Sequence, residues 1–173
     1  MPAYQRPAPD EFADFYAGYI AKVPDGDLVE TLARTGREVA ALLRSIPESR
    51  GDHAYGPGKW TIKEVLLHVI DAERVFGYRA LRIARGDPTP LPSFDENAWV
   101  PNSGAGRRTL ADLVDEFEKV RAATVALFRH LPEDAPVRRG TASNREVSVR
   151  ALGWIVAGHA LHHQGLIRER YLT

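Results

Sequence analysis

The chain has 173 residues, of which 44% are hydrophobic and 27% are charged, and this mixture is typical of one soluble globular domain spanning residues 1–173. Its 23 lysines and arginines balance 23 aspartates and glutamates, so we expect no nucleic-acid partner, and the absence of cysteine excludes disulfides, zinc fingers and a protein thiol nucleophile. No 18-residue apolar run or signal-peptide pattern is present, which predicts a cytoplasmic protein that does not enter a membrane.

Residues 1–24 are predicted to form an extended arm followed by a short helix. The first ten residues carry three prolines, and residues 10–23 have the pattern of a short amphipathic helix before the turn PDGD. Asp27 with Glu30 three residues later is a typical helix start, so the first long helix is predicted from Asp27 to about Ile46.

Three more long helices are predicted from start signals and apolar periodicity. Thr61 with Glu64 forms a capping box that opens the second long helix, which should end near Gly86. Residues 87–108, with four prolines and two glycines, cannot be a regular helix and should form a crossover or a functional cover. The third long helix should run over 109–131 and the fourth from Ser148 almost to the C-terminus, separated by a loop with room for a brief hairpin.

The segment AGHALHHQGLI, residues 157–167, contains three of the six histidines of the chain. His159 and His163 lie four residues apart in a seam of inward-facing positions, so both imidazoles can point at one spot. His68 occupies a similar seam in the second long helix. A single inward histidine is usually structural, but three buried imidazoles without partners would be costly. Histidine is also the commonest metal ligand, so we predict a metal site at His68, His159 and His163.

These elements predict an all-α four-helix bundle with a short extra N-terminal helix. A simple up-down-up-down bundle would make the second and fourth long helices parallel. His68 lies roughly 10 Å from the start of its helix and His163 roughly 12 Å from the end of its own, so their levels match best in antiparallel helices. The long proline-rich loop permits the crossover that this requires. We therefore expect up-down-down-up connectivity.

The segments PGKWTIKEVLLHVIDAERVFGYRAL and GHALHHQGLIRERYL resemble the DinB/YfiT-like superfamily, which is unrelated to the DNA polymerase that shares the DinB name. The similarity spans about 27–172. It implies a four-helix bundle with one histidine on the second helix and an H-x-x-x-H pair on the fourth, which fall on His68, His159 and His163. Many members follow the last histidine with Arg-Gly-Gln, where this chain has Gln164, Gly165 and Leu166.

Several residues near the three histidines are candidates for supporting roles. Asp71, one turn after the first ligand candidate, is either an acceptor that orients a ligand imidazole or an ordinary surface carboxylate. Trp60 is either a pocket wall or a core residue. His162 points about 100° away from His163 and is expected to pack or to line the pocket rim. Residues 94–99 of the long loop are a candidate cover. The other histidines are expected to be solvated or structural: His53 and His130.

Three histidines leave coordination positions open, as in catalytic rather than structural sites. Neutral imidazoles suit a divalent metal ion, which we expect to be zinc or nickel, with iron and copper as alternatives. The resemblance implies transfer reactions that use a low-molecular-weight thiol such as bacillithiol or mycothiol, and it is consistent with a homodimer. The leading hypothesis is therefore a metal-dependent S-transferase or isomerase acting on a small molecule. Two alternatives stay open: a non-catalytic metal-binding stress-response module, and a metal-dependent hydrolase, for which the sequence places no convincing glutamate.

Overall fold

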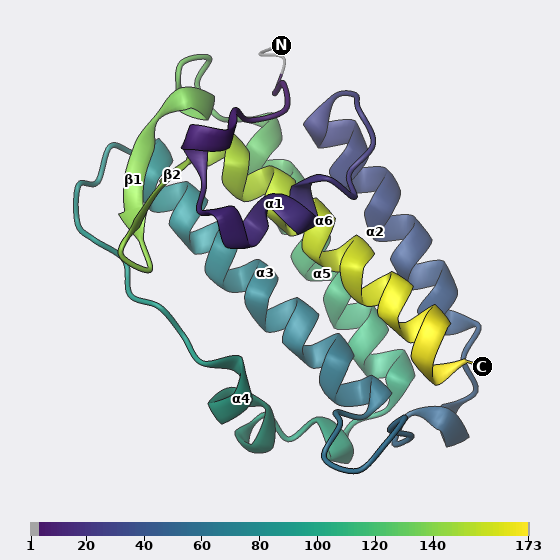
Figure 1. Cartoon of the computed structure of the whole chain (residues 1–173). Helices are drawn as coiled ribbons and strands as arrows, with labels where there is room; N and C mark the ends of the chain where they lie inside the picture. Colours follow the sequence, from purple (N-terminus) through teal and green to yellow (C-terminus); the bar gives the residue numbers. More distant parts are fainter. Residues whose placement is uncertain (1–3, 173) are drawn as a thin grey trace.

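The computed structural model describes residues 4–172 and contains four long helices packed side by side (Figure 1). Their bounds are α2 Leu28–Arg44, α3 Ile62–Ala84, α5 Leu110–Arg129 and α6 Val149–Leu166, the last continuing as a π-helical turn over Ile167–Tyr171. Each long helix begins after a capping side chain that accepts a hydrogen bond from a backbone N–H three residues on: Asp27, Thr61, Thr109 and Ser148. The predicted helix starts are therefore confirmed.

The connectivity is up-down-down-up, as predicted. Figure 1 shows α3 and α5 running in one direction and α2 and α6 in the other. Each long helix packs chiefly on two others, so that α3 lies against α5 and α6, and α2 lies against the same two helices. Helices α3 and α6 are thus antiparallel neighbours. No helix in the described residues is long and apolar enough to cross a membrane.

The loop over residues 87–108 makes this crossover. Helix α3 ends at Ala84, and Gly86 adopts the left-handed conformation with φ of 75°. The chain then returns along the outside of α3 to the opposite end of the bundle (Figure 1), with only single helical turns on the way. These are α4 Glu96–Trp99 and two 3-10 turns, Val100–Asn102 and Ala105–Arg107.

Two predicted segments differ from the structure. Residues 10–23 do not form one helix but two 3-10 turns, Pro9–Glu11 and Asp14–Tyr16, followed by α1 Ala17–Ile20. The helix is interrupted because Glu11 is buried and bonded to Arg150 of α6, which fixes the chain in an extended conformation at Phe12. The loop before α6 does contain a hairpin, with β1 Arg139–Ala142 paired antiparallel to β2 Arg145–Ser148.

The core consists of two clusters of apolar side chains, one at each end of the bundle. Polar side chains lie between them. Arg121 of α5 donates two hydrogen bonds of 2.8 and 2.9 Å to the Glu73 carboxylate of α3, and a third of 3.1 Å to the Thr35 hydroxyl of α2. All three residues are buried. This network joins three helices at one level, because none of its members can move without leaving a buried polar group unpaired.

The N-terminal helix α1 lies directly on α6 at Gly158. A Cβ atom at this glycine would lie 2.1 Å from the Tyr19 carbonyl oxygen, which is far closer than any real contact. Only glycine therefore permits α1 to approach this closely. The contact also brings the Tyr19 ring to 5.4 Å from the His159 ring, measured between centroids.

We expect Gly158→Ala to lower the free energy of unfolding by about 1–3 kcal/mol, because the backbone of α1 has to shift. Gly165→Ala is the matched control, since it lies in the same helix with no atom within 4 Å of the added Cβ. The control should be neutral or up to about 1 kcal/mol more stable. Chemical denaturation measures both variants, and limited proteolysis reports release of the N-terminal segment. Equal stability of the two variants would contradict the tight α1–α6 contact.

Candidate metal centre

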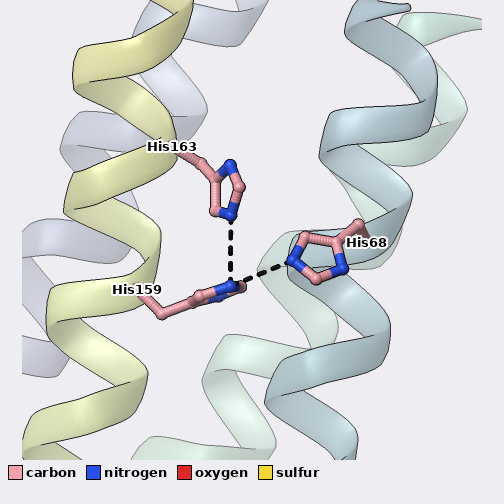
Figure 2. Close-up of side chains that lie close together, drawn as sticks. All are labelled: His68, His159 and His163. Carbon is pink, nitrogen blue, oxygen red and sulfur yellow. Dashed lines mark hydrogen bonds between the residues drawn. The ribbon is translucent and has the colours of Figure 1, made fainter. Parts of the chain in front are cut away.

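Three histidine side chains from two helices point at one another in the middle of the bundle. His68 comes from α3, and His159 and His163 come from successive turns of α6 (Figure 2). The Nε2 atom of His159 lies 3.0 Å from Nε2 of His68 and 3.1 Å from Nε2 of His163. One ring nitrogen of each residue lies within 4.8 Å of those of the other two. All three side chains are at most 9% exposed.

Hydrogen bonding among the rings cannot satisfy this arrangement. The Nε2 atom of a neutral imidazole carries either one proton or one lone pair, so His159 cannot make two good hydrogen bonds through it. A cation can satisfy all three nitrogens, because metal–nitrogen bonds of about 2.0–2.1 Å place neighbouring ligands about 2.9 Å apart in an octahedron and about 3.4 Å apart in a tetrahedron. The observed 3.0 and 3.1 Å separations lie within that range. The donor set therefore fits a divalent metal ion.

The protein keeps these imidazoles neutral. Burial lowers the pKa of His159 well below its ordinary value, and the neighbouring imidazoles lower it further. Burial likewise lowers the pKa of His163 to about 3, again helped by His68. The pKa of His68 is also lowered by burial, and the Glu96 carboxylate opposes this effect. Neutral imidazoles expose a lone pair, which is the form that ligates a metal.

A cavity of about 160 Å³ adjoins His68 and His159. Its walls come from five separate parts of the chain, namely the N-terminal segment, α3, the long loop, the hairpin turn and α6. Aromatic rings make up most of the lining, with a carboxylate and a hydroxyl among them; the residues that matter below are Tyr16, Tyr19, Phe76, Phe94, Glu96 and Ser143. The cavity is smaller than the pockets of about 300–1,000 Å³ that hold drug-sized ligands, so it suits a small molecule.

The supporting residues proposed from the sequence lie in different surroundings. The Trp60 ring is 5.0 Å from the His68 ring, but it packs against one of the apolar clusters and is not among the residues that line the cavity. His162 is half-buried, and its ring lies 5.0 Å from the His163 ring without entering the cluster. Asp71 lies 3.6 Å from Arg74, and the described residues include no hydrogen bond between Asp71 and His68. Asp71 is thus placed on the flank of α3, in an ion pair.

Sequence reasoning missed most of the cavity wall. Residues 94–99 were a candidate cover, and the loop does contribute Phe94 and Glu96. Ser143 gave no signal because it lies in a short hairpin turn, and the pattern of residues 10–23 did not distinguish Tyr19 from the other aromatic residues of that segment. Burial and the nearby charge of Glu96 raise the pKa of Tyr19. Glu96 therefore acts electrostatically on both Tyr19 and His68, and all three residues line the cavity.

The fold and the cluster together define a helical bundle with a three-histidine candidate metal centre between two antiparallel helices. Residues 31–167 match the family model of the DinB superfamily, and the chain belongs to this superfamily. No curated protein matches the chain.

Two solved structures share the fold. YfiT from Bacillus subtilis, described as a probable metal-dependent hydrolase with an unusual four-helix bundle topology, superposes with a TM-score of 0.74 at 17% identity, covering 82% of each chain. A mycothiol-dependent maleylpyruvate isomerase superposes with a TM-score of 0.68 at 17% identity, covering 84% of this chain and 61% of that one. At this level of identity the likeness establishes the bundle and its connectivity.

The lowered histidine pKa values predict how the stability of the metal-free protein depends on pH. An imidazole in the unfolded chain titrates near pH 6.5, whereas the pKa of buried His163 is about 3. Between these values the unfolded state binds a proton that the folded state does not, so stability falls as the pH falls and is unaffected above that window. We expect His163→Leu to reduce this slope by about 1.4 kcal/mol per pH unit between about pH 6 and pH 4.

Chemical denaturation of the metal-free protein at a series of pH values measures the slope. His130→Leu is the control, because His130 is exposed at the end of α5 and lies outside the cluster. An unchanged slope in His163→Leu would show that this imidazole is not buried in its neutral form.

Proposed function

We propose that this protein is a divalent-metal-dependent enzyme whose metal ion is held by His68, His159 and His163. The observation that carries the proposal is the convergence of three neutral, buried imidazole nitrogens beside a cavity. A metal that only stabilised the bundle would need no such space next to it, so the cavity argues against a non-catalytic metal-binding module. The substrate is then a small molecule bound in the cavity.

Three protein ligands leave positions at the metal for a reactant. When bound, a divalent cation would act as a Lewis acid: it would lower the pKa of a thiol or a water molecule and polarise an anionic group. Neutral imidazoles suit zinc, nickel, iron and copper alike, and among these we propose zinc or nickel, with iron or copper as the alternative. The chain's own contribution is to hold the ligand rings in place and to shape the space beside them.

The cavity residues have separate tasks in this proposal. Tyr19, Phe76 and Phe94 surround the reactant with aromatic rings and limit the entry of water. Glu96 is the carboxylate nearest the histidine cluster in the cavity lining, and it accepts a proton from the incoming nucleophile. The sequence contains no cysteine, so a sulfur nucleophile has to arrive with a cosubstrate.

For the reaction itself we propose transfer or isomerisation that depends on a low-molecular-weight thiol. The absence of a protein thiol and the shared fold with the mycothiol-dependent isomerase support this choice. Hydrolysis is the second candidate. It is favoured by Glu96, which supplies the base that the sequence alone did not reveal, and by the shared fold with YfiT.

Metal content tests the ligand set. We expect protein purified without an affinity tag to contain close to one divalent ion per chain, and His163→Ala to lose most of it, because two imidazoles bind a cation far more weakly than three. Elemental analysis gives both numbers and identifies the ion. His162→Ala is the matched control, since it removes the neighbouring histidine of the same helix and should retain the metal. Full metal content in His163→Ala would overturn the proposed site.

The nucleophile can be tested with two model reactions. If a thiol is the cosubstrate, metal-loaded protein should couple glutathione, bacillithiol or mycothiol to 1-chloro-2,4-dinitrobenzene and should leave 4-nitrophenyl acetate intact without thiol. If water is the nucleophile, the ester is cleaved without thiol, and Glu96→Gln should slow this cleavage by about 100-fold or more.

The control for Glu96→Gln is Glu133→Gln, which removes an exposed carboxylate far from the cavity lining. Metal-dependent ester cleavage without thiol, together with no thiol coupling, would reject the first candidate in favour of the second. Inactivity in both reactions, combined with a sharp loss of thermal stability on metal removal, would support the non-catalytic alternative.

A further inference from the structure

Arg79 of α3 is a buried cation without a carboxylate partner among the described residues. It is 2% exposed, and its Nη2 atom donates hydrogen bonds to two uncharged oxygens, the Pro92 carbonyl at 2.6 Å and the Ser143 hydroxyl at 2.9 Å. Arg121, which is almost as deeply buried, is matched by the carboxylate of Glu73. Burying a guanidinium without a counter-charge is unfavourable. The contrast makes Arg79 a candidate to pair with an anion that the described residues do not supply.

Arg79 lies outside the cavity lining, against residues that form the cavity wall. It follows His68 by eleven residues, which is three helical turns, so it shares the face of α3 that carries His68 and lies about 16 Å further along the axis. Its guanidinium carbon is 5.9 Å from the centroid of the Phe76 ring and 5.8 Å from that of the Phe94 ring. Both rings line the cavity. A buried positive charge therefore lies behind the cavity wall formed by Phe76, Phe94 and Ser143.

Ser143 connects this charge to the cavity. Its hydroxyl oxygen accepts the hydrogen bond from Arg79, so its own proton remains free to be donated, and Ser143 lines the cavity. A hydroxyl that accepts from a guanidinium is a stronger donor than an isolated one. Ser143 also adopts a φ of 53° at the hairpin turn, where asparagine, aspartate or glycine is favoured. The serine is therefore not the residue that the turn alone would select.

We propose that the Ser143 end of the cavity binds the carboxylate of a small acid with an apolar body, with Ser143 as the hydrogen-bond donor and Arg79 as the counter-charge behind it. This carboxylate site deepens the proposed function, and its role in a reaction rests on that proposal. Binding of the acid itself does not require the metal. The aromatic rings of Tyr16 and Phe76 would contact the apolar body. Glu96 also lines the cavity, and its negative charge disfavours a carboxylate beside it, so the acid is expected to bind with its carboxylate toward Ser143 and Arg79.

Titration of the metal-free full-length protein with benzoate and its uncharged isostere benzamide tests this assignment by calorimetry or NMR. The unmodified chain should bind benzoate about tenfold or more tightly than benzamide, as expected for hydrogen bonds to a charged group. Ser143→Gly, which relaxes the turn and removes the hydroxyl, should bring the two affinities within about threefold while leaving benzamide binding unchanged. Arg79→Gln should do the same.

Two control variants separate binding from structural effects. Asn144→Gly changes the other left-handed residue of the turn, which is exposed, and Arg74→Gln removes a positive charge from the same helix. Both should keep the preference for benzoate. No preference in the unmodified chain, or an unchanged preference in Ser143→Gly, would overturn the inference. Arg79 also connects the loop at Pro92 to the hairpin at Ser143 through hydrogen bonds, and Arg79→Gln loses its positive charge there. If that variant does not fold, Ser143→Gly alone decides the test.

The outcomes also distinguish this inference from the proposed function. A chain that binds no metal but prefers benzoate contradicts the metal-dependent enzyme and leaves the carboxylate site standing. A chain with full metal content and no preference for benzoate contradicts only the carboxylate site. If benzoate binds only after metal loading and independently of Ser143, then the acid binds at the histidine end and the inference is wrong.

Discussion

The close approach of three imidazoles across the α3–α6 interface is the constraint on which the site depends. Their nitrogens meet only if the two helices are antiparallel neighbours in one register, and the up-down-down-up connectivity provides this arrangement. A shift of α6 by one turn would move His159 by about 5.4 Å and separate it from His68. The apolar clusters on either side stabilise the bundle without specifying this register, because apolar contacts tolerate sliding better than directional ones do.

A second polar contact restricts the register from the opposite side of α3. Arg121 and Glu73 join α5 to α3, and the positive charge of Arg121 also lowers the pKa of His159. The ion pair therefore acts on the histidine cluster in two ways, since it restrains the position of α3 and disfavours protonation of the central imidazole. Buried ion pairs often contribute little net stability, so specificity of packing is the better explanation for this one.

Local sequence signals were sufficient for the long helices but not for the cavity. Asp27, Thr61 and Ser148 mark helix starts through contacts within three residues, and the seam positions of the histidines follow from helical periodicity. The cavity depends instead on contacts between distant segments. Tyr19 is positioned by the close approach of α1 to Gly158, and the hairpin that carries Ser143 is fixed by backbone bonds to Leu91. Such contacts leave no periodic pattern. Residues 10–23 were wrongly predicted as one helix because the amphipathic pattern is local, whereas the contact of Glu11 with Arg150 that interrupts the helix joins distant parts of the chain.

The second nitrogen of one ligand candidate differs from the rest of the cluster in its surroundings. The Nδ1 atom of His163 is buried without a hydrogen-bond partner among the described residues. When Nε2 offers its lone pair to a metal, Nδ1 must carry the proton, and a buried donor without an acceptor is unfavourable by about 1–3 kcal/mol. Partners of this kind typically account for 10–100-fold in metal affinity. Among the described residues, the His163 ring is therefore held by packing against its neighbours rather than by a hydrogen bond to Nδ1.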